Sequence, residues 1–502
     1  MAILPASCSS ARFVLRILGV AGGPRVVHLG PSGPRSKGGR AVRTNADTER
    51  VARLLGAWRR SGAPVGVALR DALAELIDGS YLPTGRRMPG QRDLAAVLGV
   101  ARGTVVRAYT ELAASGRLAS RRGSGTYVRG AAGPARPAEG RLSSFGGGRD
   151  VVDLSSGALP GSELVGRVMQ QVGRQLRAHH LQGTGYHPAG LAELRAALAA
   201  RCTERGLPTR ADQVMVTAGS QQAVWLIATA LAGPGTSTLV EEPSYRGALE
   251  ALAAAGGRVR GVPCTPAGID LDLLQAAVAD ADLLYVQTAL HNPTGVHTPQ
   301  PQRRQLAETA ARHGTLVIDD QSQADLAWFR SEPLPGLERM ADPDRLLIVG
   351  TLSKLFWGGL RVGWVRGPRE IVGRLAELRG SVDLGGPVTD QLAALHLLPH
   401  ADRQRELRRA FLLRQFEDTR EILRTVLPGW RWDTPAGGSG IWTDTGRDAV
   451  VLAQRALARG IRLTAGPAFS PHGGHRTFVR LPVWQPQGRF AGAARVIADL
   501  AG

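Results

Sequence analysis

The alternation of short apolar runs with longer helical patterns after Asp153 is the feature that most restricts the fold of this chain. Short apolar runs between helices are typical of a mostly parallel sheet that is covered by helices on both faces. We therefore predict that residues 153–502 form a large α/β domain with a smaller C-terminal subdomain. The runs that we assign to buried strands are residues 214–219, 237–243, 282–288, 314–320 and 345–351.

The N-terminal part of the chain follows a different pattern. Residues 1–48 mix Gly, Pro, Ser and Arg without a regular apolar period, which is typical of a disordered basic tail. Residues 49–128 show regular helical spacing and are expected to form a separate domain, and residues 129–152 have the composition of a linker. No apolar run reaches the roughly 18–20 residues of a membrane-spanning helix. The 3 cysteines lie far apart, without the spacing of a disulfide framework or a zinc site. We therefore expect a cytoplasmic protein without a metal site.

The positive charge of the chain is concentrated near its N-terminus. Residues 1–150 contain 24 Lys and Arg against 9 Asp and Glu, whereas the remaining residues contain 38 against 33. Such an asymmetry is typical of a region that binds nucleic acid or an anionic membrane. A solvated basic tail in a chain generally rich in arginine is the alternative.

Residues 91–128 have the pattern of a helix-turn-helix followed by a β-hairpin. Two short helices are predicted on either side of a turn at Gly99, and two short strands are predicted to pair around residues 122–125. In a DNA-binding helix-turn-helix the second helix enters the major groove, where arginine can contact guanine edges or phosphates. A small helical interaction domain with a basic surface is the alternative. The second helix has an apolar stripe of Val105, Ala108, Tyr109 and Leu112, and a polar face of Arg102, Thr104 and Arg107.

The sequence of this segment resembles that of the GntR family of winged-helix regulators. The sequences MPGQRDLA (88–95) and ARGTVVRAYTEL (101–112) are similar to the P-S-x-R-x-L-A and S-R-x-T-V-x-x-A-Y-x-x-L patterns of that family, with Gln91 as a mild departure. The resemblance implies a double-stranded DNA partner, an operator near its own or a neighbouring gene. The residues that it places on DNA are Arg92, Arg102, Thr104, Arg107 and Gly123 of the wing.

Lysine is almost absent from the chain. Of the 62 Lys and Arg residues only Lys37 and Lys354 are lysines, and Lys37 lies in the predicted tail. Lys354 follows an apolar strand in the segment GTLSKLFWGGLRVGW (350–364). A primary amine forms a Schiff base with an aldehyde, which arginine cannot do. Lys354 is therefore a candidate attachment point for an aldehyde cofactor, and a single surviving surface lysine is the alternative.

The surroundings of Lys354 resemble the cofactor-lysine motif of fold-type I aminotransferases. Four further segments are similar to this family in the expected order, namely TAGSQQA (217–223), EEPSY (241–245), HNPTG (291–295) and VIDDQ (317–321). The resemblance implies a fold-type I, aspartate aminotransferase-like domain that binds pyridoxal 5'-phosphate, with Lys354 as the Schiff-base lysine.

The same resemblance implies a role for each matching residue. Asp319 would keep the pyridine nitrogen protonated, so that the ring acts as an electron sink. Gly219, Ser220 and Gln221 lie at a strand-to-helix turn, where backbone N–H groups can cradle a phosphate. The other implied cofactor contacts are Tyr245 for ring stacking, Asn292 for the phenolic oxygen, and Thr351, Ser353 and Arg361 for the phosphate.

The resemblance also suggests roles for three further residues, on less specific matches. Tyr186 is similar to the tyrosine that reaches the phosphate of a neighbouring subunit, which requires a homodimer. Arg480 is similar to the arginine that binds a substrate or effector carboxylate, with a structural ion pair as the alternative. Gln321 stands where the family usually has tyrosine, and it can donate a hydrogen bond but cannot ionise. This departure makes efficient transamination less expected than cofactor binding.

The whole arrangement over residues 49–502 resembles the MocR subfamily of GntR regulators, which includes the GabR and PdxR types. We predict a homodimeric transcription regulator that senses an amino compound, or pyridoxal phosphate itself, through an aldimine on Lys354. A catalytically active aminotransferase with an incidental DNA-binding appendage is the main alternative. A repressor whose large domain serves only for dimerisation is a further one. The effector and the operator sequence do not follow from the residues.

Overall fold

The computed structural model describes residues 46–501, apart from 56–57, 60–63, 79–81, 83–86, 122–124, 129–150 and 331. The predicted tail up to residue 45, most of the predicted linker and Gly123 of the predicted wing lie outside the described residues. No helix in the described part of the chain is long and apolar enough to cross a membrane.

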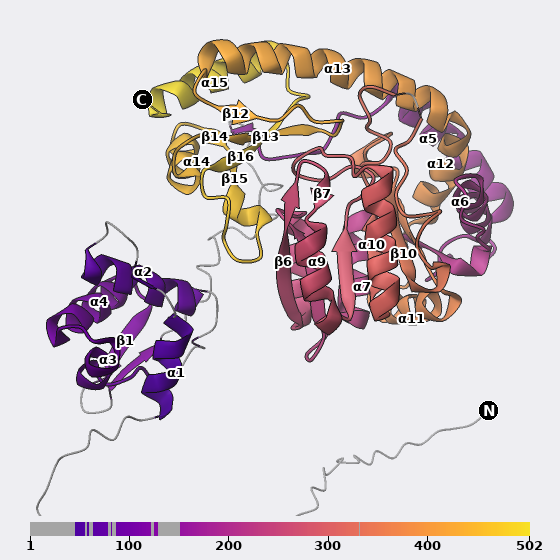
Figure 1. Ribbon diagram of the computed structural model, residues 1–502. Coiled ribbons are helices and arrows are strands. Elements are labelled where there is room, and N and C mark those ends of the chain that lie inside the picture. Colours follow the sequence, from indigo (N-terminus) through magenta and orange to yellow (C-terminus); the bar gives the residue numbers. More distant parts are fainter. Residues whose placement is uncertain are drawn as a thin grey trace, which may run out of the picture.

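The N-terminal domain is a winged helix (Figure 1). The predicted turn between the two short helices is present, because Gly99 ends the first of them in the left-handed conformation with φ 62°. The predicted apolar stripe of the second helix is buried and packs on Leu69 and Leu73 of the helix at residues 65–78. The two strands pair in antiparallel register, with Leu118 opposite Val128. The elements are α1 (Ala46–Leu55), α2 (Val65–Asp78), α3 (Gln91–Leu98), α4 (Arg102–Ala114), β1 (Leu118–Arg121) and β2 (Gly125–Val128).

The large domain is built on an 8-stranded sheet of order β4-β11-β10-β9-β8-β5-β6-β7. The strands from β10 to β6 in this order are parallel, whereas β11 and β7 run antiparallel to their neighbours. Each of the five predicted apolar runs contains one of these strands. The bounds are β4 (Val214–Thr217), β5 (Ser237–Glu242), β6 (Arg258–Thr265), β7 (Gly268–Ile269), β8 (Leu283–Val286), β9 (Leu316–Asp320), β10 (Leu346–Thr351) and β11 (Gly363–Arg366).

Helices cover both faces of this sheet, as predicted. One face packs on α7, α8 and α11. The other face packs on α9 and α10, and on α5, α6 and α12 toward β4. The helices are α5 (Glu163–His179), α6 (Ala192–Glu204), α7 (Ser220–Leu231), α8 (Arg246–Ala255), α9 (Leu271–Ala277), α10 (Gln300–His313), α11 (Arg369–Gly380) and α12 (Val388–Leu397).

The predicted C-terminal subdomain has its own sheet and core. Its sheet has the order β12-β13-β16-β15, and the long α13 runs along the top of the view in Figure 1. The arm that enters the large domain, residues 151–160, joins this subdomain because β3 pairs with β14. The elements are β3 (Val152–Asp153), α13 (Ala401–Val426), β12 (Arg431–Trp432), β13 (Gly440–Asp444), α14 (Ala449–Ala458), β14 (Ile461–Arg462), β15 (Thr464–Ala465), β16 (Phe478–Pro482) and α15 (Gln487–Ala501).

Candidate cofactor site and DNA interface

Lys354 follows β10 and directs its amine into the interior of the large domain. The Nζ atom donates a hydrogen bond of 2.9 Å to the carbonyl of Gly157. Burial, followed by the positive charge of Arg480, lowers the pKa of Lys354 to about 8. A larger fraction of this amine is therefore neutral near physiological pH than for an exposed lysine, and the neutral amine is the nucleophilic form.

The charges around Lys354 are unbalanced. Its charged neighbours are Arg480, Arg246 and Arg361 on the positive side and Asp320 on the negative side. Burial also lowers the pKa of Arg480 to about 10. Buried charges are costly unless they are paired. The excess of cationic groups therefore fits a ligand that carries negative charge, such as a phosphate together with a carboxylate.

A candidate cradle for an anion lies at the start of α7. Gly219 caps this helix with φ 83°, and a Cβ atom at this position would lie 2.6 Å from Nη2 of Arg361. Only a glycine therefore allows the guanidinium to approach the helix N-terminus, where backbone N–H groups favour an anion. Arg361 itself has φ 48°, and its guanidinium donates to the carbonyl of Ala218. This backbone conformation is uncommon for a residue with a side chain and is held by these local contacts.

Two of the predicted cofactor contacts have a buried polar atom without a hydrogen-bond partner among the described residues. These atoms are Oγ of Ser353 and Oδ1 of Asn292. Buried polar atoms are normally satisfied, so such atoms indicate a missing partner. The orphaned atoms, the cationic excess and the glycine cradle together fit a phosphorylated aldehyde. The hydroxyl of Thr351, in contrast, is already bonded to the carbonyl of Val362 at 3.0 Å.

The predicted stacking residue lies in the same site. Tyr245 donates a hydrogen bond of 2.8 Å from its hydroxyl to Oε1 of Gln221, which joins two of the predicted contacts. Its charged neighbours include Asp320, Arg361 and Arg480. Burial raises the pKa of Tyr245 to about 12, so the phenol stays neutral. Tyr186 instead has an exposed side chain.

Asp319 is not among the charged neighbours of Lys354. Its carboxylate accepts hydrogen bonds from the backbone N–H and hydroxyl of Thr288, from the backbone N–H of Leu337 and from Nε2 of Gln321. Neighbouring residues of a strand point to opposite faces of the sheet, so Asp320 points the other way. Asp320 is the acidic group that faces Lys354 and Tyr245. The structure thus separates Asp319 and Gln321 from the other predicted cofactor contacts.

Gly157 is a contact that the sequence did not indicate. It lies on the arm, and besides accepting the hydrogen bond from Lys354 it packs against Arg480. A Cβ atom at position 157 would lie 2.5 Å from Nη2 of Arg480, whose guanidinium also donates to the Ser439 hydroxyl at 2.9 Å. A glycine that acts through its backbone carbonyl leaves no chemical signal in a sequence. One residue of the arm therefore contacts both the candidate cofactor lysine and the candidate carboxylate-binding arginine.

The winged helix presents a basic face at α3 and α4. The side chains of Arg92, Arg102 and Arg107 are exposed, and Thr104 is half-buried beside them. None of these three arginines forms an ion pair with a described residue, whereas Arg70 on α2 is paired with Glu111 at 3.1 Å. Free guanidinium groups beside a recognition helix are available for phosphates and base edges.

Comparisons with known proteins agree with both halves of this description. Residues 149–483 match the family model "Aminotransferase class I and II", and residues 67–128 match "Bacterial regulatory proteins, gntR family". A solved structure of LysN, an α-aminoadipate aminotransferase from Thermus thermophilus complexed with N-(5'-phosphopyridoxyl)-L-leucine, superposes with a TM-score of 0.66. It is 27% identical and covers 73% of this chain and 96% of its own. The large domain is thus a pyridoxal phosphate-binding domain of fold type I, joined to a GntR winged helix.

Relatives with both domains define the family more closely. The HTH-type transcriptional regulator TauR of Rhodobacter capsulatus is 30% identical over 82% of this chain and 91% of its own length. The HTH-type pyridoxine biosynthesis transcriptional regulator PdxR of Corynebacterium glutamicum is 29% identical over 72% of this chain and 78% of its own. The chain belongs to the MocR-type subfamily of GntR transcription regulators, which are pyridoxal phosphate-dependent DNA-binding proteins.

Proposed function

We propose that this regulator senses a small amino compound with a carboxylate group at the site around Lys354, and that the arm carries the response toward the winged helix. The contact of Gly157 with both Lys354 and Arg480 is the observation that carries this proposal. A ligand whose amine replaces Lys354 and whose carboxylate binds Arg480 changes both contacts of the arm at once. The arm follows the segment that connects to the winged helix in the chain.

When bound, pyridoxal phosphate supplies an aldehyde that condenses with primary amines and a ring that withdraws electrons. Lys354 would hold the cofactor covalently in the absence of the effector. The phosphate would be held by Arg361, by the free backbone N–H groups at the start of α7 and by the unpartnered Ser353 hydroxyl. Tyr245 would lie against the ring, and Asn292 would face its phenolic oxygen.

We assign the carboxylate opposite the ring nitrogen to Asp320 instead of Asp319, because Asp320 lies on the Lys354 side of the sheet. Its other contacts fix its orientation, since it accepts hydrogen bonds from the Tyr285 hydroxyl at 2.6 Å and from the backbone N–H of Ser322 at 2.9 Å. Gln321 contacts Asp319 on the other face and does not replace a cofactor-binding tyrosine. Its effect on the cofactor would be indirect.

On the DNA side, Arg92, Arg102, Thr104 and Arg107 would contact the operator, together with the wing. A homodimer would place two winged helices on two half-sites, whose spacing reads out the arrangement of the subunits. The exposed Tyr186 is available to complete the phosphate site of the partner subunit. Half-site spacing is the property that effector binding would change.

The test is binding of the purified chain to DNA from upstream of its own gene, compared with scrambled DNA, with and without pyridoxal phosphate and a panel of amino acids. It is done near physiological salt, because non-specific phosphate contacts weaken steeply there. Specific binding that changes with the cofactor and one amino acid supports the proposal. A response to the cofactor alone favours a sensor of pyridoxal phosphate, as the name of the PdxR relative suggests. No specific binding in any state, together with turnover of an amino acid and a keto acid, would favour the aminotransferase alternative.

A further inference from the structure

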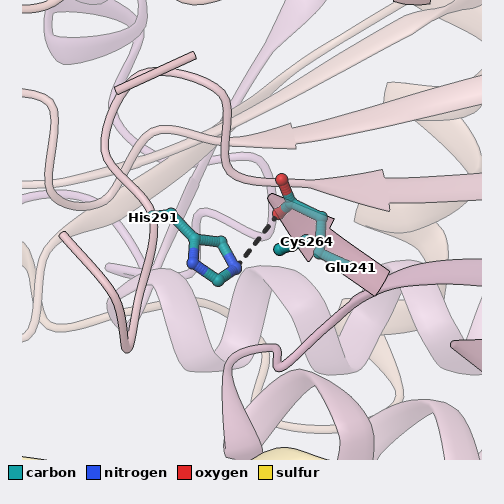
Figure 2. A group of neighbouring side chains, drawn as sticks. All are labelled: Glu241, Cys264 and His291. Atoms are coloured by element: carbon teal, nitrogen blue, oxygen red, sulfur yellow. Dashed lines mark ion pairs between the residues drawn. The ribbon is translucent and has the colours of Figure 1, made fainter. Parts of the chain in front are cut away.

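A group of three potential metal ligands lies at the carboxyl ends of three adjacent parallel strands. Glu241 is near the end of β5, Cys264 is near the end of β6, and His291 lies in the loop that follows β8. One ligand atom from each residue lies within 4.8 Å of the other two. Figure 2 shows the imidazole ring of His291 pointing at the Glu241 carboxylate, with Cys264 beside them. The fold thus collects a nitrogen, an oxygen and a sulfur ligand from separate segments.

The cluster is separate from the Lys354 site. Leu239 packs in the core between the sheet and the helices α9 and α10. Alternate residues of a strand share a face, so Glu241 points to the same side as Leu239. The charged neighbours of Glu241 are Asp319, which also points away from Lys354, and Asp320, which follows it at the end of β9. None of the predicted cofactor contacts uses these three side chains.

The His291 imidazole directs an unpartnered ring nitrogen toward the other two potential ligands. Its Nδ1 is paired with the hydroxyl of Thr294 at 2.7 Å, which leaves Nε2 facing the cluster. Nε2 is buried without a hydrogen-bond partner among the described residues, and it lies 3.5 Å from Oε2 of Glu241. That oxygen is held by the backbone N–H of Gln287 at 2.7 Å. Metal-binding histidines and carboxylates are typically fixed by such outer contacts.

The ligand types, together with the distance between His291 and Glu241, favour one class of ion. In a tetrahedral zinc site with bonds of about 2.1 Å, two ligand atoms lie about 3.4 Å apart, close to the 3.5 Å between His291 and Glu241. A thiolate, an imidazole and a carboxylate suit zinc, whereas magnesium and calcium require oxygen ligands. Two anionic ligands also balance the charge of a divalent ion in a buried site. We propose that Glu241, Cys264 and His291 bind one zinc ion, with water as the fourth ligand.

Such an ion would clamp two loops that carry candidate cofactor contacts. The chain passes from Glu241 through Pro243 to Tyr245, and His291 directly precedes Asn292. Zinc would therefore hold the two loops in place from the face of the sheet opposite Lys354. Only this consequence depends on the proposed cofactor contacts; the binding of zinc itself does not.

The test is the zinc content of the untagged, full-length protein, followed by removal of the metal with a chelator and titration with zinc alone. We expect one bound zinc per chain, and a loss of affinity of more than about tenfold in the variants Cys264→Ser and His291→Ala. Cys202→Ser is the matched control, because Cys202 is also a free thiol but belongs to no such cluster among the described residues. Replacement of zinc by cobalt(II) should give a thiolate charge-transfer band that Cys264→Ser removes and Cys202→Ser keeps.

Glu241→Gln is nearly isosteric and covers the case in which the other variants fail to fold. Zinc should raise the melting temperature of the wild-type chain and of the Cys202→Ser variant, because an ion stabilises only the state that binds it. The melting temperature of the Glu241→Gln variant should not change when zinc is added. An absence of zinc uptake by the wild-type chain would overturn the proposal. Equal uptake by the Cys264→Ser and Cys202→Ser variants would overturn it as well.

Discussion

The two carboxylates at the end of β9 are neighbours in sequence and lie in different surroundings. Asp319 accepts four hydrogen bonds from the protein, from Thr288, Leu337 and Gln321, and is fully enclosed. Asp320 faces Lys354 and the arginines around it. A carboxylate has about four lone-pair sites, so Asp319 has little capacity left for a ligand. These surroundings support the proposal that Asp320, and not Asp319, faces the cofactor.

The largest effect should follow removal of the only amine on the Lys354 face. With Lys354→Ala we expect complete loss of pyridoxal phosphate fixed by borohydride, measured by mass spectrometry of the labelled peptide. Lys354→Arg keeps the charge but cannot form the bond, so it should also lose the label. Since Lys37 is the only other lysine, wild-type label found mainly on the Lys37 peptide would contradict the assignment.

Much of the fold follows from apolar periodicity, and the site follows less completely. The stripe of Val105, Tyr109 and Leu112 predicted the recognition helix, and the five apolar runs predicted the central strands. The face on which Asp319 or Asp320 lies could not be predicted in the same way. Side chains in a strand alternate, so a shift of one residue moves a carboxylate to the opposite face of the sheet.

The contact of Gly157 and the separate cluster of potential metal ligands could not be predicted from the sequence, for different reasons. Gly157 acts through a backbone carbonyl, which every residue type possesses. Glu241, Cys264 and His291 come from three separate segments, so no local spacing indicates that they meet. Their proximity depends on the order of β6, β5 and β8 in the sheet, which is a tertiary property.

The next largest effect should separate the two carboxylates directly. Asp320→Asn removes the negative charge that would pair with the ring nitrogen. A hydrogen bond to a charged group contributes about 1.5–3 kcal/mol, so cofactor affinity should fall by roughly 10–100-fold. Asp319→Asn should change this affinity by less than about threefold, because its partners are neutral groups of the protein. Absorbance titration with pyridoxal phosphate measures both, and equal losses would refute the distinction.

A smaller and more selective effect is expected at Arg480. Arg480→Gln should weaken the response of DNA binding to an amino acid by about tenfold or more, since one charge-assisted pair with the carboxylate is lost. Affinity for pyridoxal phosphate should change much less, because the phosphate is assigned to the cradle at Gly219. Arg476→Gln is the control, because Arg476 is exposed and paired with Asp448. A comparable loss of response in that variant would indicate a general effect of charge.

The smallest effect is the change in the stability of the folded protein with pH as Asp319 titrates. Burial, followed by the charge of Glu338, raises the pKa of Asp319 to about 6. The folded state therefore holds this proton more tightly than the unfolded state, whose aspartate pKa is about 3.9. The resulting stabilisation is present below the unfolded value and is lost as the pH rises through about 6. The melting temperature of the wild-type chain minus that of Asp319→Asn should accordingly fall between about pH 4 and pH 7. The melting-temperature difference between the wild-type chain and Asp320→Asn serves as the comparison, because Asp320 lies beside Lys354. A difference for Asp319→Asn that does not change between about pH 4 and pH 7 would show that Asp319 is ionised over this whole range.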